Sequence, residues 1–183
     1  MSKGIKLFGV AAATALCVAL ATTSVGCKSV PTTDSMYRTS YAVGVATGMI
    51  ANETKIDDAS RNAICDIINV VSSCIPETNQ TFEAAWTPIA KAHIAKLVED
   101  GKLDDAQARM VETVFSLAIQ GIDYLFEYRY PKAKAYKEVV VAAIDGFSGG
   151  FLNVFKPANT TLSASRTVEF DAEAYQWLKA NRK

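Results

Sequence analysis

A long amphipathic stretch from Asp104 to Tyr130 constrains the fold of this chain more than any other part of its sequence. Its apolar side chains recur at the spacing of one helical face, at Met110, Val111, Val114, Leu117, Ala118, Gly121, Ile122 and Leu125. Asp104 and Gln107 form a variant of the capping box that starts a helix, and Pro131 ends the run. Such a helix has about 26 residues and a length of about 39 Å. We predict that it forms the centre of a helical bundle.

The rest of the chain after residue 34 also has the pattern of helices joined by short connectors. The first expected helix, residues 35–52, is apolar at Tyr37, Tyr41, Val45, Gly48 and Met49. The second begins at an N-cap of Asp57 or Asp58 and ends before Pro76. The segment from Thr81 to Gly101 is either one helix kinked at Pro88 or two short helices.

Two further helices are expected, over residues 132–155 and from an N-cap at Asp171 through Leu178, where Phe170 and Tyr175 fit a hydrophobic staple. The stretch TVEF, residues 167–170, is the candidate for one short strand. We therefore predict an all-α fold, a compact bundle of five to six mostly antiparallel helices.

The N-terminus has the pattern of an export signal. Lys3 and Lys6 precede an uncharged run, residues 7–21, that is shorter than the roughly 20 apolar residues of a membrane-spanning helix. A small-x-small site at residues 19–21 would release a soluble chain that starts at Thr22. A second candidate site follows within a few residues and predicts a different product.

The second site is SVGC, residues 24–27, which resembles the lipobox of bacterial lipoproteins. The match covers Val25, Gly26 and Cys27, and it departs at Ser24, where this family usually has an aliphatic residue. The resemblance implies cleavage before Cys27, a diacylglyceryl group on its sulfur, and a bacterial envelope or a phage gene expressed in one. We favour this site over soluble export because a short polar segment containing a proline follows it.

The expected organisation is a signal peptide over residues 1–26, a lipidated tether over 27–34 and a single helical domain over 35–183. Some bacteria retain lipoproteins in the inner membrane through an Asp after the lipidated cysteine. Lys28 occupies that position here, which favours the outer membrane over the inner one.

Charge and cysteine content restrict the possible functions. Removal of residues 1–26 leaves 17 basic and 19 acidic side chains, a balance that does not recruit nucleic acid. Cys65 and Cys74 would lie about 13 Å apart along one helix, on nearly opposite faces. We predict two separate, mostly buried thiols rather than a disulfide.

No residue pattern indicates an enzyme. His93 is the only histidine and lies at the edge of an apolar helical face. We interpret it as a residue at the edge of the core rather than as the base for a nucleophile. The acidic pairs at residues 57–58, 99–100 and 104–105 fall at helix ends, where capping explains most of them. We expect a non-catalytic protein without a metal ion or cofactor.

Asp123 and Asp145 are the first candidates for a ligand site, because each interrupts an apolar helical run. Each either faces water or points inward to a partner such as Arg129 or Lys137. We favour the outward orientation, since charged side chains are seldom fully buried. If both face one cavity, a ligand site is expected there.

The segment from Tyr124 to Lys137 interleaves tyrosines with basic residues. Tyr124, Tyr128 and Arg129 are therefore further ligand candidates, for example toward an anionic envelope polymer. The alternative, which we favour, is a helix–helix corner with tyrosine rings at the edge of the core and the lysines in water.

Two GxxxG spacings indicate close helix packing. Gly44 and Gly48 lie in the first expected helix, and Gly146 and Gly150 lie in the helix over residues 132–155. Glycine lowers helix propensity unless a close contact compensates for it. We predict that these two helices pack against each other through the four glycines.

These patterns together predict a lipid-anchored, periplasm-facing protein of the bacterial cell envelope with a helical interaction or structural domain. Its expected partners are the membrane, through the N-terminal lipid, and an envelope protein or polymer. The alternative is a periplasmic helical binding module for a small apolar or anionic ligand.

Overall fold

The computed structural model describes residues 30–157 and 171–181, and within these ranges it confirms the all-α bundle. The order of elements is α2 (Thr33–Asn52), α3 (Asp58–Ser72), α4 (Phe82–Glu99), α5 (Asp105–Asp123), η1 (Tyr124–Arg129), η2 (Ala133–Ala135), α6 (Lys137–Val154) and α7 (Ala172–Asn181). The described residues contain no strand, and the candidate strand at 167–170 lies outside them.

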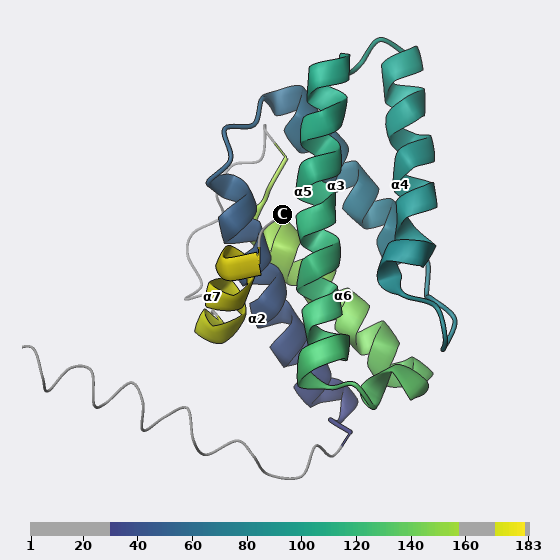
Figure 1. Ribbon diagram of the computed structural model, residues 1–183, viewed down its shortest axis with the longest axis vertical. Coiled ribbons are helices and arrows are strands. Elements are labelled where there is room, and N and C mark those ends of the chain that lie inside the picture. The colour runs from purple at the N-terminus through teal and green to yellow at the C-terminus, as the bar shows by residue number, and fades with distance from the viewer. Residues whose placement is uncertain (1–29, 158–170, 182–183) are drawn as a thin grey trace, which may run out of the picture.

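Helix α5 is the central element, as its apolar stripe predicts. It runs along the long axis of the molecule (Figure 1) and contacts every other α-helix of the described ranges. The capping box is present: the Gln107 amide donates to Asp104 Oδ1 at 2.8 Å, and the Asp104 amide donates to Gln107 Oε1 at 2.9 Å. The helix predicted up to Tyr130 is α-helical only to Asp123. A π-helical segment, η1, whose turns are wider, continues it to Arg129.

Helices α2 and α6 form the closest pair, and all four predicted glycines lie between them. A Cβ atom on Gly44 would collide with the backbone of Phe147, and one on Gly150 would collide with the backbone of Tyr41. Gly44 faces Phe147 while Gly48 faces Phe151, so the two helices run parallel. The bundle was predicted to be mostly antiparallel, as short connectors make consecutive helices. Helices α2 and α6 are not consecutive, since α3, α4 and α5 lie between them in the chain, so they can pack in parallel.

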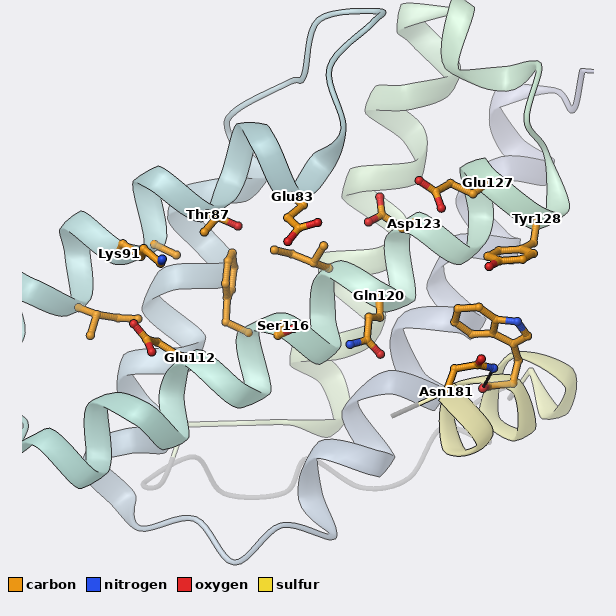
Figure 2. Close-up of a pocket in the computed structure, with 15 residues that line it drawn as sticks. Glu83, Thr87, Lys91, Glu112, Ser116, Gln120, Asp123, Glu127, Tyr128 and Asn181 are labelled. Atoms are coloured by element: carbon orange, nitrogen blue, oxygen red, sulfur yellow. Dashed lines mark hydrogen bonds between the residues drawn. The ribbon is translucent and has the colours of Figure 1, made fainter. Parts of the chain in front are cut away.

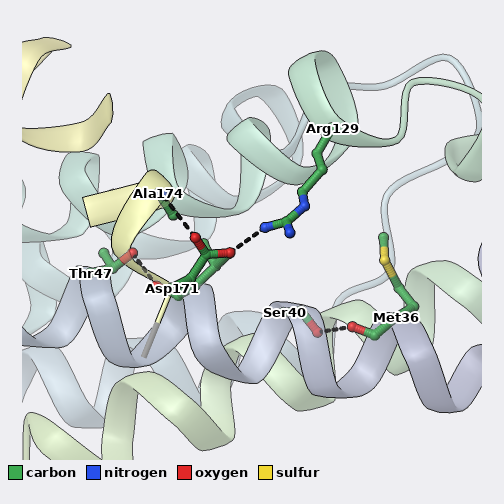
Figure 3. A network of polar contacts seen from close by, with 7 residues as sticks. Met36, Ser40, Thr47, Arg129, Asp171 and Ala174 are labelled. Carbon is green, nitrogen blue, oxygen red and sulfur yellow. Dashed lines mark hydrogen bonds and ion pairs between the residues drawn. The ribbon is translucent and has the colours of Figure 1, made fainter. Parts of the chain in front are cut away.

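The buried face of α2 differs from the prediction. Tyr37 and Met49 are 43% and 41% exposed, whereas Ser40 and Thr47 are fully buried. The Ser40 hydroxyl donates to the Met36 carbonyl at 2.7 Å (Figure 3), and the Thr47 hydroxyl donates to a carbonyl of its own helix at 2.9 Å. Because α5, α6 and α7 all cover α2, short side chains that satisfy themselves on the helix backbone occupy its interior.

Several helix boundaries also differ from expectation. Helix α2 begins at Thr33 with Thr32 as N-cap, so it includes the last two residues of the segment predicted as a tether, 27–34. Helix α4 begins after N-cap Thr81 and continues through Pro88, which excludes two short helices. Helix α6 begins only at Lys137, because a 3₁₀ turn over residues 133–135 follows Pro131.

The two described cysteines are free thiols, as predicted. Cys65 is buried in α3, whereas Cys74 lies beyond the end of that helix and is only half-buried. Burial raises the pKa of the Cys65 thiol to about 11, so it stays protonated at neutral pH.

Candidate functional site: an acidic cleft between α4 and α5

A cleft of about 470 Å³ lies between α4 and α5 and is closed at one end by η1 and α7 (Figure 2). Helix α4 contributes Glu83, Thr87, Ala90, Lys91 and Ile94. Helix α5 and η1 contribute Glu112, Phe115, Ser116, Ile119, Gln120, Asp123, Glu127 and Tyr128, and α7 contributes Trp177 and Asn181. The volume is within the range of about 300–1,000 Å³ that is usual for small-molecule sites.

The floor of the cleft is apolar. Ala90 and Ile94 on α4 and Phe115 and Ile119 on α5 are all buried, and they belong to the same core that holds the two helices together. The cleft therefore combines an apolar floor with polar walls, which is the usual composition of a ligand site.

The walls are acidic. Four carboxylates line the cleft, at Glu83, Glu112, Asp123 and Glu127, against the single ammonium of Lys91. Figure 2 shows Glu83, Asp123 and Glu127 near one another, with Lys91 on the side of Glu112. The carboxylates repel anions, so the cleft does not suit the anionic ligand considered from the sequence.

Asp123 has the most perturbed carboxyl group at the site. Its pKa is raised from the usual 3.8 to about 7, chiefly by burial and also by the negative charges of Glu127 and Glu83, while Lys134 lowers it in part. The side chain forms no hydrogen bond or ion pair among the described residues. A half-buried carboxyl with this pKa in a cleft is a typical property of functional sites.

Gln120 carries a buried polar atom without a partner. Its Oε1 atom is buried and accepts no hydrogen bond from the described part of the chain. A buried acceptor without a donor costs about 1–3 kcal/mol, and such groups are rare in native proteins. Because Gln120 lines the cleft one turn before Asp123, a ligand that donates a hydrogen bond would satisfy it.

Two aromatic rings form the end of the cleft. The rings of Tyr128 and Trp177 have centroids 4.8 Å apart and planes inclined by 56°, and Tyr128 is 56% exposed. Beneath them Tyr124 is buried, with its ring centroid 5.2 Å from that of Trp177. Burial raises the pKa of Tyr124 to about 12, so its hydroxyl remains protonated. The Tyr124 ring packs against the rings of both Tyr128 and Trp177.

Helix α7 supplies Trp177, and polar contacts with η1 and with the residue after α2 hold this helix in place. Arg129 at the end of η1 forms an ion pair with Asp171, which also caps α7 by accepting from the Ala174 amide at 2.9 Å (Figure 3). On the opposite side, Lys179 Nζ lies 2.8 Å from a carboxylate oxygen of Glu53 on the chain that follows α2. The position of α7 therefore depends on residues far from it in sequence.

The structure brings together some of the predicted ligand residues and separates others. Asp123 and Tyr128 line the cleft, and Tyr124 supports it. Arg129 pairs with Asp171 and not with Asp123, so one inward partner suggested for the aspartates is engaged elsewhere. Asp145 is exposed on α6 and does not line the cleft, so the two aspartates do not share a cavity.

The tyrosine-rich segment spans η1, η2 and the start of α6, and two of its tyrosines, Tyr128 and Tyr136, are 56% and 52% exposed. Tyr124 is buried, while Lys132 and Lys137 are exposed. The sequence analysis missed Gln120, Glu83 and Trp177. A signal for Gln120 exists, because the polar residues of α5 and η1 recur at helical spacing along one face, at Glu112, Ser116, Gln120, Asp123 and Glu127.

The chemistry that the cleft can support follows from its lining. No histidine or cysteine lines it in the described part of the chain, and His93 is half-buried elsewhere on α4. Among the described residues, no group of three or more histidine, cysteine or acidic side chains is placed to hold a metal ion. Across the same ranges, every helix falls short of the length or apolarity that crossing a bilayer requires.

Comparison of the chain with protein-family models, curated proteins and solved structures finds no match. The lipobox-like residues 24–27, with Cys27, lie outside the described residues. Function is therefore inferred from the N-terminal sequence and from the cleft.

Proposed function

We propose that this chain is a non-catalytic binding protein of the bacterial cell envelope, anchored by a lipid on Cys27 and facing the periplasm. Its helical domain binds another envelope component through the cleft between α4 and α5. The outer membrane is the favoured location because Lys28 follows the cysteine.

The observation that carries the binding role is the cleft, with its half-buried Asp123 and its buried Gln120 oxygen that has no donor. Both groups reduce the stability of the free protein, because a desolvated carboxylate and an unsatisfied acceptor are each unfavourable. A cleft that keeps such destabilising groups, and that combines apolar, acidic and aromatic side chains in its lining, supports a ligand-binding role. The near-neutral charge of the domain and the lipobox-like N-terminus support the envelope location.

The anchor is tested by intact mass spectrometry of the protein expressed with its own N-terminus in a bacterial host. We expect the mass of a chain that starts at Cys27 and carries a diacylglyceryl group and an N-acyl chain. The variant Cys27→Ser should lose the lipid mass. A wild-type mass that starts at Thr22 would show a soluble exported protein instead.

The binding role is tested by filling the cleft. Ser116→Trp adds an indole to the lining of the cleft, whereas Ser73→Trp adds the same group at the end of α3, outside the cleft; both positions are exposed. Each variant is extracted from membranes under native conditions, and small molecules that co-purify are identified by mass spectrometry. We expect Ser116→Trp to lose material that the wild type and Ser73→Trp retain. Equal retention by all three proteins would refute a role for the cleft.

A further inference from the structure

The proposed binding role leaves open which class of ligand the cleft takes, and the chemistry of its lining answers this. We propose that the ligand is an organic ammonium ion with an apolar chain, whose charged head lies among Glu83, Asp123 and Glu127 and whose chain lies along the apolar floor. This inference rests on the proposed function and adds the identity of the ligand class to it.

The sign of the ligand charge follows from the carboxylates at the aromatic end. Glu83 lies on α4, Asp123 is the last residue of α5, and Glu127 lies on η1. The negative charges of Glu83 and Glu127 both raise the pKa of the Asp123 carboxyl. Lys91 lies well apart from Asp123 and Glu127 in Figure 2 and does not neutralise this end. A bound cation would relieve the mutual repulsion of the three carboxylates.

The Gln120 oxygen is a second observation, independent of the acidic residues. It is buried, lines the cleft and has no donor among the described residues. An ammonium group carries up to three N–H donors, so a ligand of this class can supply the kind of donor that this oxygen lacks. A metal ion does not explain the arrangement, because the described acidic residues include no group spaced to coordinate one.

The rings of Tyr128 and Trp177 add a third interaction for an organic cation. Both rings line the carboxylate end of the cleft, where they pack against each other with centroids 4.8 Å apart and leave only their outward faces for a ligand. Ammonium groups bind such faces with about 0.5–2 kcal/mol, most strongly on tryptophan. The floor of Ala90, Ile94, Phe115 and Ile119 then provides a surface for a hydrocarbon chain.

Binding of an ammonium ion should depend on pH. The ion favours the charged form of Asp123, whereas the free protein holds this carboxyl partly protonated near neutrality. The titratable groups that face Asp123 are Glu83 from α4, Glu127 from η1 and Lys134 from η2. The affinity should therefore be highest above pH 7 and should decrease as the pH falls toward 5.

The test uses three probes of the same chain length, hexylamine, hexanoate and hexanol, which are cationic, anionic and neutral at pH 8. The full lipidated protein is placed in lipid nanodiscs, and binding is measured by calorimetry with empty nanodiscs as blank. We expect hexylamine to bind at least tenfold more tightly than hexanol, with no binding of hexanoate. Binding of hexanoate or hexanol as tight as that of hexylamine would overturn the proposal.

A matched pair of variants locates the binding. Asp123→Asn removes the half-buried carboxylate of the cleft, and Asp145→Asn removes an exposed carboxylate on α6. We expect the first to weaken hexylamine binding at pH 8 at least tenfold and the second to leave it unchanged. An equal loss in both variants would overturn the proposal, since it would indicate attraction by overall charge alone.

Failure of this inference and failure of the proposed function give different results. If hexylamine does not bind while Ser116→Trp still abolishes co-purification, the cleft is a binding site and the ammonium class is wrong. If hexylamine does not bind and Ser116→Trp retains the same material as the wild type, the binding role of the cleft is wrong as well.

Discussion

Replacement of Asp123 by asparagine should stabilise the protein at high pH and leave it unchanged at low pH. The carboxyl has a pKa of about 7 in the folded chain and about 3.8 in the unfolded chain, chiefly because folding removes it from water. Between these values the folded state holds a proton that the unfolded state has released. Stability is therefore greatest below pH 3.8 and is lost as the pH rises through 7.

The size of the effect follows from the same shift. At about 1.4 kcal/mol per pH unit, a change from 3.8 to about 7 corresponds to about 4 kcal/mol for a fully buried group. Asp123 is half-buried, so solvent screening reduces this, and we expect about 2 kcal/mol. Asparagine has nearly the same shape and carries no charge at any pH, so it avoids this cost.

The assay is urea unfolding followed by far-ultraviolet circular dichroism at pH 4, 6 and 8. The gain in unfolding free energy of Asp123→Asn should be near zero at pH 4 and about 2 kcal/mol at pH 8. Asp145→Asn is the control, since it removes an exposed carboxylate from α6. A gain for Asp123→Asn that is the same at pH 4 and pH 8, or a loss at pH 8, would refute the reasoning.

Three further predictions concern the fold. Gly150→Ala should destabilise the protein by about 3 kcal/mol or more in thermal unfolding, because the new Cβ would collide with the backbone of α2, whereas Gly149→Ala, whose nearest neighbour would be 3.8 Å away, should stabilise it by about 0.5–1 kcal/mol. Equal effects of the two substitutions would contradict the close packing of α2 and α6. Arg129→Gln should lower the free energy of unfolding by about 1–2 kcal/mol. It should also raise amide hydrogen exchange across α7 while α3 stays protected. Unchanged exchange in α7 would rule out the ion pair as the contact that holds this helix. Native protein treated with iodoacetamide at pH 8 should be modified at Cys74 and, only after unfolding, at Cys65; modification of Cys65 first would contradict its burial.

The elements that sequence patterns predict well are those fixed by local physics. The capping box of Asp104 and Gln107 involves one turn of backbone, and the glycines at positions 44 and 150 lack the Cβ atoms that would prevent close helix contact. The buried face of α2 was harder to predict, because three other helices cover it. Ser40 and Thr47 could therefore be buried in place of Tyr37, since their hydroxyl groups bond to their own helix.

The cleft depends on contacts between distant parts of the chain, which explains why only part of it could be predicted. Asp123 stands out in the sequence because it interrupts an apolar run. Trp177 reaches the site because α7 packs against distant parts of the chain; one of its contacts is the ion pair of Arg129 and Asp171, residues 42 positions apart. Asp145 interrupts an apolar run in the same way as Asp123, yet it faces away from the cleft. Local pattern alone does not distinguish the two.

The most direct test of a cation-binding cleft is the titration of the Asp123 carboxyl by carbon-13 NMR, with and without hexylamine. Protein labelled at the aspartate carboxyl carbons provides the signal, and Asp123→Asn assigns it. We predict a midpoint near pH 7 for the free protein, since burial and two neighbouring carboxylates favour the protonated form. Saturating hexylamine should lower that midpoint to about 5 or below, because a nearby cation stabilises the ionised form. A midpoint near 3.8 in the free protein, or one that hexylamine does not move, would contradict the proposed site.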